Sequence, residues 1–134
     1  MFLKWQPIYS VNVKEIDEQH QKMFSLIEKV FEVKKNYSKE LVAVIIKELR
    51  DYGAFHLDVE EKYFIKFNYP DKEAHILQHN KYREKVIDFE NRINQTDDRA
   101  LVKEMAHFLK DWWLGHIQYT DQKYSDFFNL HGLT

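Results

Sequence analysis

The feature that most constrains the fold is a repeated spacing of apolar side chains. In four long stretches the apolar residues recur every three or four positions, the period that places them on one face of an α-helix. With only three glycines and two prolines in 134 residues, such stretches have few points at which to break. Four amphipathic helices with short connections favour an all-α fold, an antiparallel up-down four-helix bundle. The predicted helices span about residues 18–36, 39–66, 71–93 and 97–128.

Local signals set the expected boundaries of these helices. An N-terminal arm over about residues 1–16 contains Pro7, and we expect this arm to be extended and to pack on the bundle. Ser38 and Thr96 are predicted N-caps, because a hydroxyl can accept a hydrogen bond from a free backbone N–H of the first turn. The chain shows no internal repeat and no boundary of a second domain. We therefore predict a single domain over residues 1–134.

The charge balance argues against two classes of partner. The chain carries 20 Lys and Arg residues and 22 Asp and Glu residues, a formal net charge of −2. This balance predicts neither nucleic-acid binding nor attraction to an anionic membrane. The longest aliphatic run, LVAVII, is far too short to span a bilayer, and the first residues lack the pattern of a secretory signal. The absence of cysteine excludes disulfides and thiolate metal sites, and we expect a cytoplasmic protein.

Histidines lie on the apolar faces of the predicted helices. Each helix carries one on its inner stripe, and a second follows one turn later in the segment HILQH. Two acidic residues share the pattern. The set is His20, His56, Glu60, His75, His79, His116 and Asp121. A lone buried histidine is more often a hydrogen-bonded core residue, but burying this many unpaired polar groups would cost about 1–3 kcal/mol each. A bound metal removes that cost.

The donor types narrow the choice of metal. Imidazole and carboxylate without sulfur suit iron or another first-row divalent ion. A single zinc ion would use about four of these groups and leave the others idle. Two six-coordinate ions accommodate all of them. If both carboxylates bridge the ions, and one oxide or hydroxide also bridges them, a single position stays open for a small ligand.

The pattern resembles the hemerythrin family, in particular the bacterial single-domain bacteriohemerythrins. His20 and the segments HLDVE, HILQH and HIQYTD fill the family's di-iron signature in order. The flanks match as well: W-x-P at residues 5–7, IDEQH at 16–20, YP at 69–70, and a tryptophan four residues before the last ligand histidine. The resemblance covers nearly the whole chain.

The resemblance implies two iron ions with a bridging oxide or hydroxide, and reversible binding of O2 for storage, carriage or delivery. One iron would take His75, His79 and His116. The other would take His20 and His56 and keep the position for O2. Glu60 and Asp121 would bridge the ions. We also expect a monomer that is not an enzyme, with an O2-consuming enzyme as the recipient of its O2.

The same matching predicts the lining of the O2 pocket: Met23, Leu57, Trp112, Trp113 and Ile117. The chain departs from the family at Trp113, where leucine is common. Three orientations of this side chain are open. It narrows the route to the open iron, or offers its indole N–H to the ligand, or turns outward into a neighbouring groove.

The spacing of His116 and Asp121 leaves a further choice open. Positions five residues apart on a regular α-helix do not return to the same face. Either the two side chains reach the ions from different angles, or the helix widens locally by a π-type turn.

Other functions remain open on the same residues. The iron pair could belong to an enzyme that reduces peroxide or nitric oxide, or to an O2 or nitric oxide sensor that acts through a separate protein. The apolar pocket favours O2 binding, because an enzyme would need proton donors beside the open iron. A metal-free phosphotransfer bundle needs one exposed histidine and leaves the other residues of the set unexplained. Glu104 and His107 form a Glu-x-x-His motif of the kind that ferritin-like proteins use, but its companion motifs are missing, so we predict that His107 is a surface or flank residue.

Overall fold

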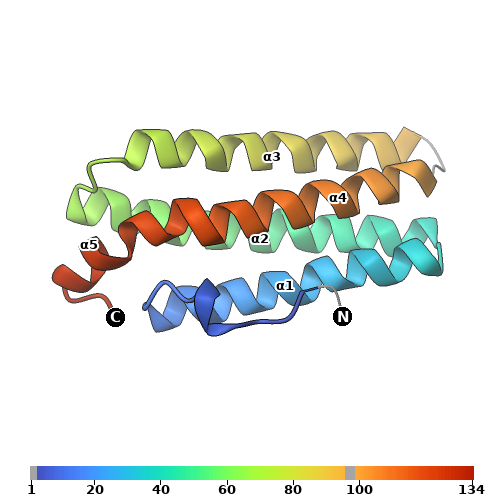
Figure 1. The fold of residues 1–134 in the computed structure, drawn as a ribbon. Helices are drawn as coiled ribbons and strands as arrows, with labels where there is room; N and C mark the ends of the chain where they lie inside the picture. Colours follow the sequence, from blue (N-terminus) through green and yellow to red (C-terminus); the bar gives the residue numbers. More distant parts are fainter. Residues whose placement is uncertain (1–2, 96–98) are drawn as a thin grey trace.

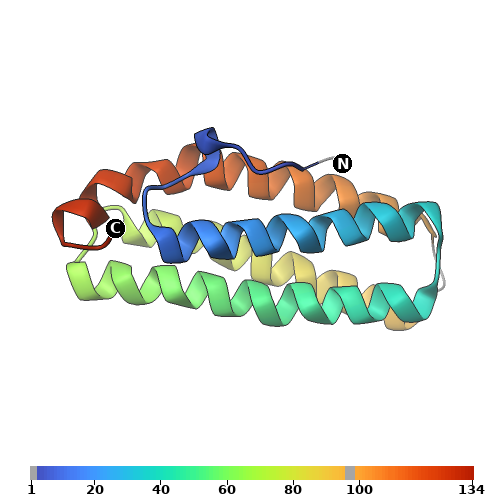
Figure 2. The same ribbon diagram turned by 90° about the horizontal axis from the view of Figure 1, so that it is seen from below.

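Four long antiparallel helices make up the computed structural model, which describes residues 3–95 and 99–134 (Figure 1, Figure 2). They are α1 (Lys14–Lys35), α2 (Lys39–Phe67), α3 (Lys72–Gln95) and α4 (Arg99–Gly115). Short turns join α1 to α2 and α2 to α3, so consecutive helices lie as antiparallel neighbours. α1 also packs against α4, which closes the bundle. The predicted all-α four-helix bundle is confirmed, and the described residues contain no strand.

The first helix begins at Lys14 rather than at residue 18. Asn12 adopts a left-handed backbone, with φ of 58°, and turns the chain into the helix almost directly. The carboxylate of Asp17 accepts a hydrogen bond from the backbone N–H of Val11 at 2.9 Å, which ties the arm to the first turn of α1. The arm is not extended throughout, because it contains the 3₁₀ turn η1 (Pro7–Tyr9), whose first φ proline presets.

Two helix ends follow the expected chemistry. The hydroxyl of Ser38 accepts a hydrogen bond from the N–H of Leu41 at 3.3 Å, so the predicted N-cap of α2 is confirmed. Asn68 caps the C-terminal end of α2, and its backbone is left-handed (φ 53°) while its N–H donates to carbonyls of the last helical turn. The predicted N-cap at Thr96 lies outside the described residues.

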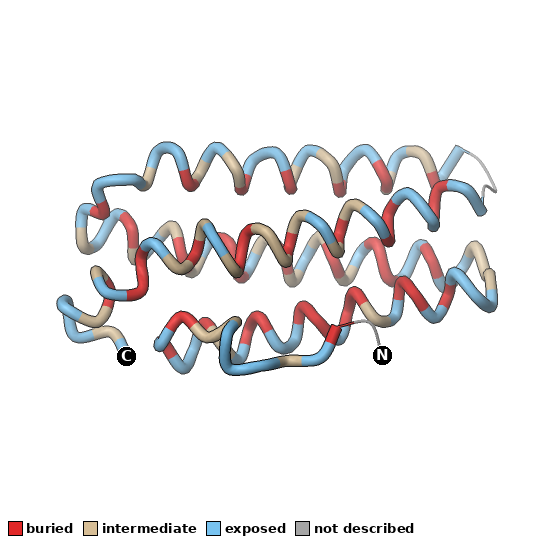
Figure 3. The backbone as a smooth tube through the Cα atoms, in the orientation of Figure 1, coloured by how far each residue is buried: buried red, intermediate tan, exposed pale blue. Residues whose placement is uncertain are grey.

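Buried residues face inward along all four helices (Figure 3). They form a long apolar cluster through the bundle and a smaller aromatic cluster near the α2–α3 turn. Close packing in the long cluster depends on Gly53, because a Cβ there would lie 2.8 Å from Cε2 of the buried Tyr82 ring. Among the described residues, no helix is long and apolar enough to cross a membrane.

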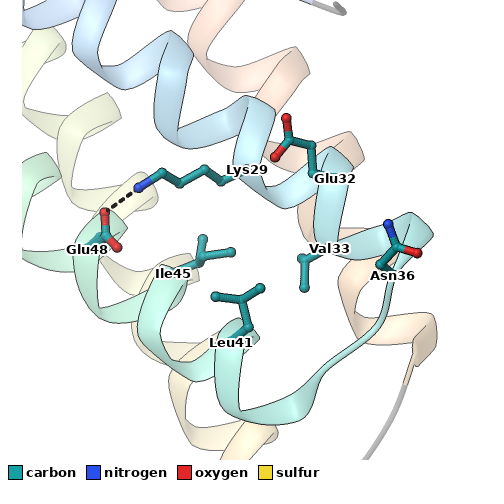
Figure 4. A pocket seen from close by; sticks show the side chains of 7 residues that line it. All are labelled: Lys29, Glu32, Val33, Asn36, Leu41, Ile45 and Glu48. Atoms are coloured by element: carbon teal, nitrogen blue, oxygen red, sulfur yellow. Dashed lines mark hydrogen bonds and ion pairs between the residues drawn. The ribbon is translucent and has the colours of Figure 1, made fainter.

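A surface depression lies where α1 runs into α2 (Figure 4). It measures about 370 Å³, and the Lys29–Glu48 ion pair, 3.3 Å long, lies beside its apolar floor. Its lining residues are Lys29, Glu32, Val33, Asn36, Leu41, Ile45 and Glu48. None of them is a histidine, and they sit at the end of the bundle opposite to the α2–α3 turn.

Candidate metal centre

Seven buried polar side chains converge in the half of the bundle near the α2–α3 turn. They are His20 from α1, His56 and Glu60 from α2, His75 and His79 from α3, and His116 and Asp121, which follow α4. All seven are at most 3% exposed. Their ligand-type atoms form two groups, each with members within 4.8 Å of one another, and Glu60 belongs to both groups. The fold thus brings together every residue that the sequence predicted as a ligand.

The Nε2 atoms of the imidazoles face one another. His20 Nε2 lies 3.1 Å from His56 Nε2, and His116 Nε2 lies 3.1 Å from His75 Nε2 and 3.2 Å from His79 Nε2. Two donors at right angles about an ion, each about 2.1 Å away from it, lie about 3.0 Å apart. The observed spacing therefore fits nitrogens that share an ion.

Glu60 faces both histidine groups. Its Oε1 lies 3.1 Å from His79 Nε2, and its Oε2 lies 3.6 Å from His56 Nε2. The hydroxyl of Tyr124 donates a hydrogen bond to Oε2, a contact that the sequence reasoning missed. Burial and the nearby carboxylates raise the pKa of Tyr124 well above its usual value, so the hydroxyl stays a donor. The signal in the sequence was its position one helical turn after Asp121.

The two carboxylate oxygens of Asp121 likewise face different histidine groups. Oδ1 lies 3.0 Å from the Nε2 atoms of His75 and His116, and Oδ2 lies 3.1 Å from that of His20. Neither oxygen has a partner with hydrogen-bond geometry. A buried carboxylate left in this state is rare and costly. The residues therefore fit a bridge between two metal ions.

The chain widens between the last two members of the set. α4 ends at Gly115 and is followed by a π-helical turn, η2 (His116–Thr120), in which the N–H of Asp121 donates to the carbonyl of His116. A 3₁₀ turn, η3 (Asp121–Tyr124), and the short helix α5 (Ser125–Leu130) complete the chain. The helix predicted to run to residue 128 is thus interrupted. Of the two alternatives, the π-type turn is the correct one, since it brings positions five apart onto one face.

Two glutamines lie within hydrogen-bond distance of the Nδ1 atoms of two ligand histidines, on the side away from the cluster. The sequence did not predict either contact. Gln19 Oε1 lies 2.6 Å from His56 Nδ1, and Gln78 Oε1 lies 3.1 Å from His116 Nδ1. A proton on Nδ1 leaves the Nε2 lone pair free for a metal. Each glutamine stands next to a different ligand in the sequence, so its partner could not be inferred from its neighbours.

The charges of the cluster residues also suit metal binding. Burial lowers the pKa of His56 to about 3, so this imidazole is neutral. Burial opposes charge on His79 as well, but Glu60 and Glu61 raise its pKa to about 9. Burial would raise the pKa of Asp121, yet the surrounding imidazoles hold it well below its usual value. The cluster therefore offers ionised carboxylates beside imidazoles.

The five predicted pocket residues lie in or against the long apolar cluster. Met23, Leu57, Trp113 and Ile117 are fully buried, and Trp112 is half-buried with its ring stacked on His116 at 4.4 Å between centroids. The outward orientation of Trp113 is excluded. Its ring centroid lies 5.7 Å from that of His56 and 6.5 Å from that of His20, and its Nε1 has no hydrogen-bond partner.

The remaining histidines stay outside the cluster. His107 is exposed on α4, and its neighbour in the Glu-x-x-His motif, Glu104, pairs with Arg92 at 2.6 Å. His131 is exposed near the C-terminus, with its Nδ1 2.8 Å from the carbonyl of Phe127. Both are surface residues, as predicted for His107.

Comparison with known proteins agrees with this geometry. The family model of the hemerythrin HHE cation binding domain matches residues 11–128. A bacteriohemerythrin of Clostridium acetobutylicum is 30% identical, covering 91% of this chain and 98% of that protein, and one of Stenotrophomonas maltophilia is 26% identical, covering 96% and 83%. The crystal structure of a wild-type hemerythrin, 22% identical, shares the fold with a TM-score of 0.84 and covers 94% of this chain and 97% of that one. None of these names denotes an enzyme, in line with the expectation of a binding protein. The chain belongs to the hemerythrin family.

Proposed function

We propose that the cluster holds two iron ions and that the protein binds O2 reversibly. His75, His79 and His116 would hold one ion, His20 and His56 the other, and Glu60 and Asp121 would bridge them. The observation that carries the proposal is that both carboxylates divide their oxygens between the two histidine groups. The sulfur-free donor set suits iron, and membership of the hemerythrin family supports that choice.

When bound, an iron pair of this kind supplies electrons reversibly to a small oxidising ligand such as O2. The residues around it would control access. The open position would lie on the side of His20 and His56, next to the ring of Trp113. The buried side chains of Met23 and Leu57 belong to the same apolar cluster and would keep water away from the ligand.

The composition of the pocket favours binding over reductive catalysis. None of its five predicted lining residues carries a carboxyl, imidazole or thiol group that could deliver protons to a bound ligand. An enzyme that reduces peroxide or nitric oxide would need such a donor beside the open position. Reversible binding needs only that the ligand be retained and released.

An absorption spectrum of the purified protein, loaded with Fe²⁺ without air, tests the proposal. We expect about two irons per chain and a visible band that forms with O2 and disappears under inert gas. Iron that oxidises at once and does not recover would favour the sensor or enzyme alternatives. Failure to take up iron would overturn the proposal.

We further propose a cytoplasmic monomer that passes O2 to an O2-consuming enzyme. The near-neutral charge supports a role that involves neither nucleic acid nor an anionic membrane. Light scattering of the purified protein would test the monomer. A stable dimer would refute that part and leave the metal centre unaffected.

A further inference from the structure

A chain of charged side chains connects the surface to one histidine of the cluster. Glu61 Oε2 accepts a hydrogen bond from His79 Nδ1 at 2.7 Å and lies 2.8 Å from Arg83 Nη1. Arg83 Nη2 donates to Asp58 Oδ1 at 3.0 Å. The Arg83 and Glu61 side chains are 26% and 19% exposed, whereas that of His79 is fully buried. Arg83 thus anchors the carboxylate that stands behind a buried imidazole.

We propose that Arg83 is a positioning residue for the metal centre. It holds Glu61 against His79, and this contact helps the three-histidine position to bind its ion with the higher affinity of the two. This inference rests on the proposed function, since it requires the cluster to bind two ions. It goes further by ranking the two positions and naming a surface residue that adds to the advantage of the third imidazole.

Helix geometry allows Arg83 to act in this way. Arg83 follows His79 by four residues on α3, so both side chains project from the same face. Asp58 and Glu61 lie three residues apart on α2 and present adjacent carboxylates to the fixed fork of the guanidinium. Without that anchor a partly exposed glutamate would sample several rotamers. Such a surface ion pair contributes little to folding stability, so its main effect is on the position of Glu61.

The two metal positions differ in the groups that contact the Nδ1 atoms of their histidine ligands. In the three-histidine position His79 has a carboxylate at its Nδ1, while His116 faces the neutral amide of Gln78. In the other position His56 also faces a neutral amide, that of Gln19, and His20 Nδ1 has no hydrogen-bond partner, so the carboxylate at His79 is what distinguishes the two. A carboxylate fixes the orientation of an imidazole and raises the basicity of its metal-facing nitrogen, and charge-assisted hydrogen bonds are about twice as strong as neutral ones. We therefore expect the position of His20 and His56 to bind an ion more weakly.

Titration of the ion-free protein with Co²⁺ tests the inference, because the d–d absorption of this ion reports its coordination and requires no O2. We expect the wild-type protein to fill in two steps. Arg83→Met removes the guanidinium but keeps much of the aliphatic stem. It should weaken the first step by about tenfold or more and leave the second within about twofold. Arg83→Lys keeps one charge and should restore part of the loss.

Arg50→Met is the matched control. Arg50 also pairs with two carboxylates, those of Asp51 at 3.2 Å and Glu90 at 2.5 Å, but neither belongs to the cluster. We expect both Co²⁺ steps of this variant to be unchanged. Circular dichroism of the ion-free variants checks folding, and if Arg83→Met loses structure, the Arg83→Lys titration decides.

Three results would overturn the inference: single-step filling of the wild-type protein, an unchanged first step in Arg83→Met, or equal losses in both steps. These results leave the proposed function standing, because two ions are still bound. Failure of the wild-type protein to bind Co²⁺ or iron would instead refute the metal centre itself, and the inference with it.

Discussion

Replacing Tyr124 with phenylalanine isolates the interaction that holds Glu60 in the ion-free protein. The hydroxyl of Tyr124 donates to Glu60 Oε2, and both side chains are fully buried. The Tyr124 ring stacks on that of Phe128, with 4.4 Å between ring centroids, and packs against that of Phe64, with 5.7 Å between centroids. A phenylalanine ring would keep both contacts. Although burial opposes it, the surrounding imidazoles hold the pKa of Glu60 at about 2, so the carboxylate is ionised at neutral pH. The substitution therefore takes a hydrogen-bond donor from a buried anion.

The expected loss is that of a hydrogen bond to a charged group, about 1.5–3 kcal/mol. The unfolding entropy of a chain of 134 residues is about 0.28 kcal/mol/K, so Tm should fall by about 5–11 °C. Differential scanning calorimetry of the ion-free Tyr124→Phe protein measures this fall. In the iron-loaded protein Glu60 Oε2 would be a ligand, and the loss should be below about 1 kcal/mol.

Tyr63→Phe is the control for this experiment. Its hydroxyl donates to Glu15 Oε1 at 2.5 Å, but the pair is exposed, so we expect a change within about 0.5 kcal/mol. A loss below about 0.5 kcal/mol in ion-free Tyr124→Phe would contradict the reasoning, because it would mean that Glu60 is neutral or hydrated. Equal losses with and without iron would show that Glu60 does not bind the metal.

Three further predictions follow from the same structure. Trp113→Leu should speed both O2 release and oxidation of the iron by about tenfold, which corresponds to a loss of about 1.4 kcal/mol in interaction free energy. Stopped-flow rates equal to those of the wild-type protein would refute this. Gly53→Ala should destabilise the protein by about 1–3 kcal/mol in chemical denaturation, because the new Cβ would meet Tyr82 at 2.8 Å, whereas Gly115→Ala, with nothing within 4 Å, should stabilise it by about 0.5–1 kcal/mol. The pKa of His79, about 9 when folded and ion-free, exceeds the unfolded value of about 6.5, so its stabilisation is complete below about pH 6.5 and is lost as pH rises through 9. Melting curves between pH 6.5 and 9.5 should show this loss without metal and not with it.

The sequence alone determined the four helices and the seven converging side chains. The helices and six of the seven side chains, all but Asp121, are encoded in local periodicity: apolar residues every three or four positions define an inner face, and a histidine or glutamate on that face must point into the bundle whatever the helix packs against. His56 and Glu60, or His75 and His79, share a face because one turn separates them. The sequence could also show that positions 116 and 121 need an irregular turn or different approach angles, but not which of the two.

Only the tertiary structure decided the contacts that depend on how the helices are rotated and aligned. Gln19 is next to His20 in the sequence, but its side chain contacts His56. The inward orientation of Trp113 cannot be read from the residues next to it in the sequence. The left-handed turn at Asn12, the π-type turn after Gly115 and the Arg83–Glu61 anchor also became visible only in three dimensions. The physical reason is that close packing of the whole core sets helix rotation and register, and a shift of about 1 Å is enough to exchange one hydrogen-bond partner for another.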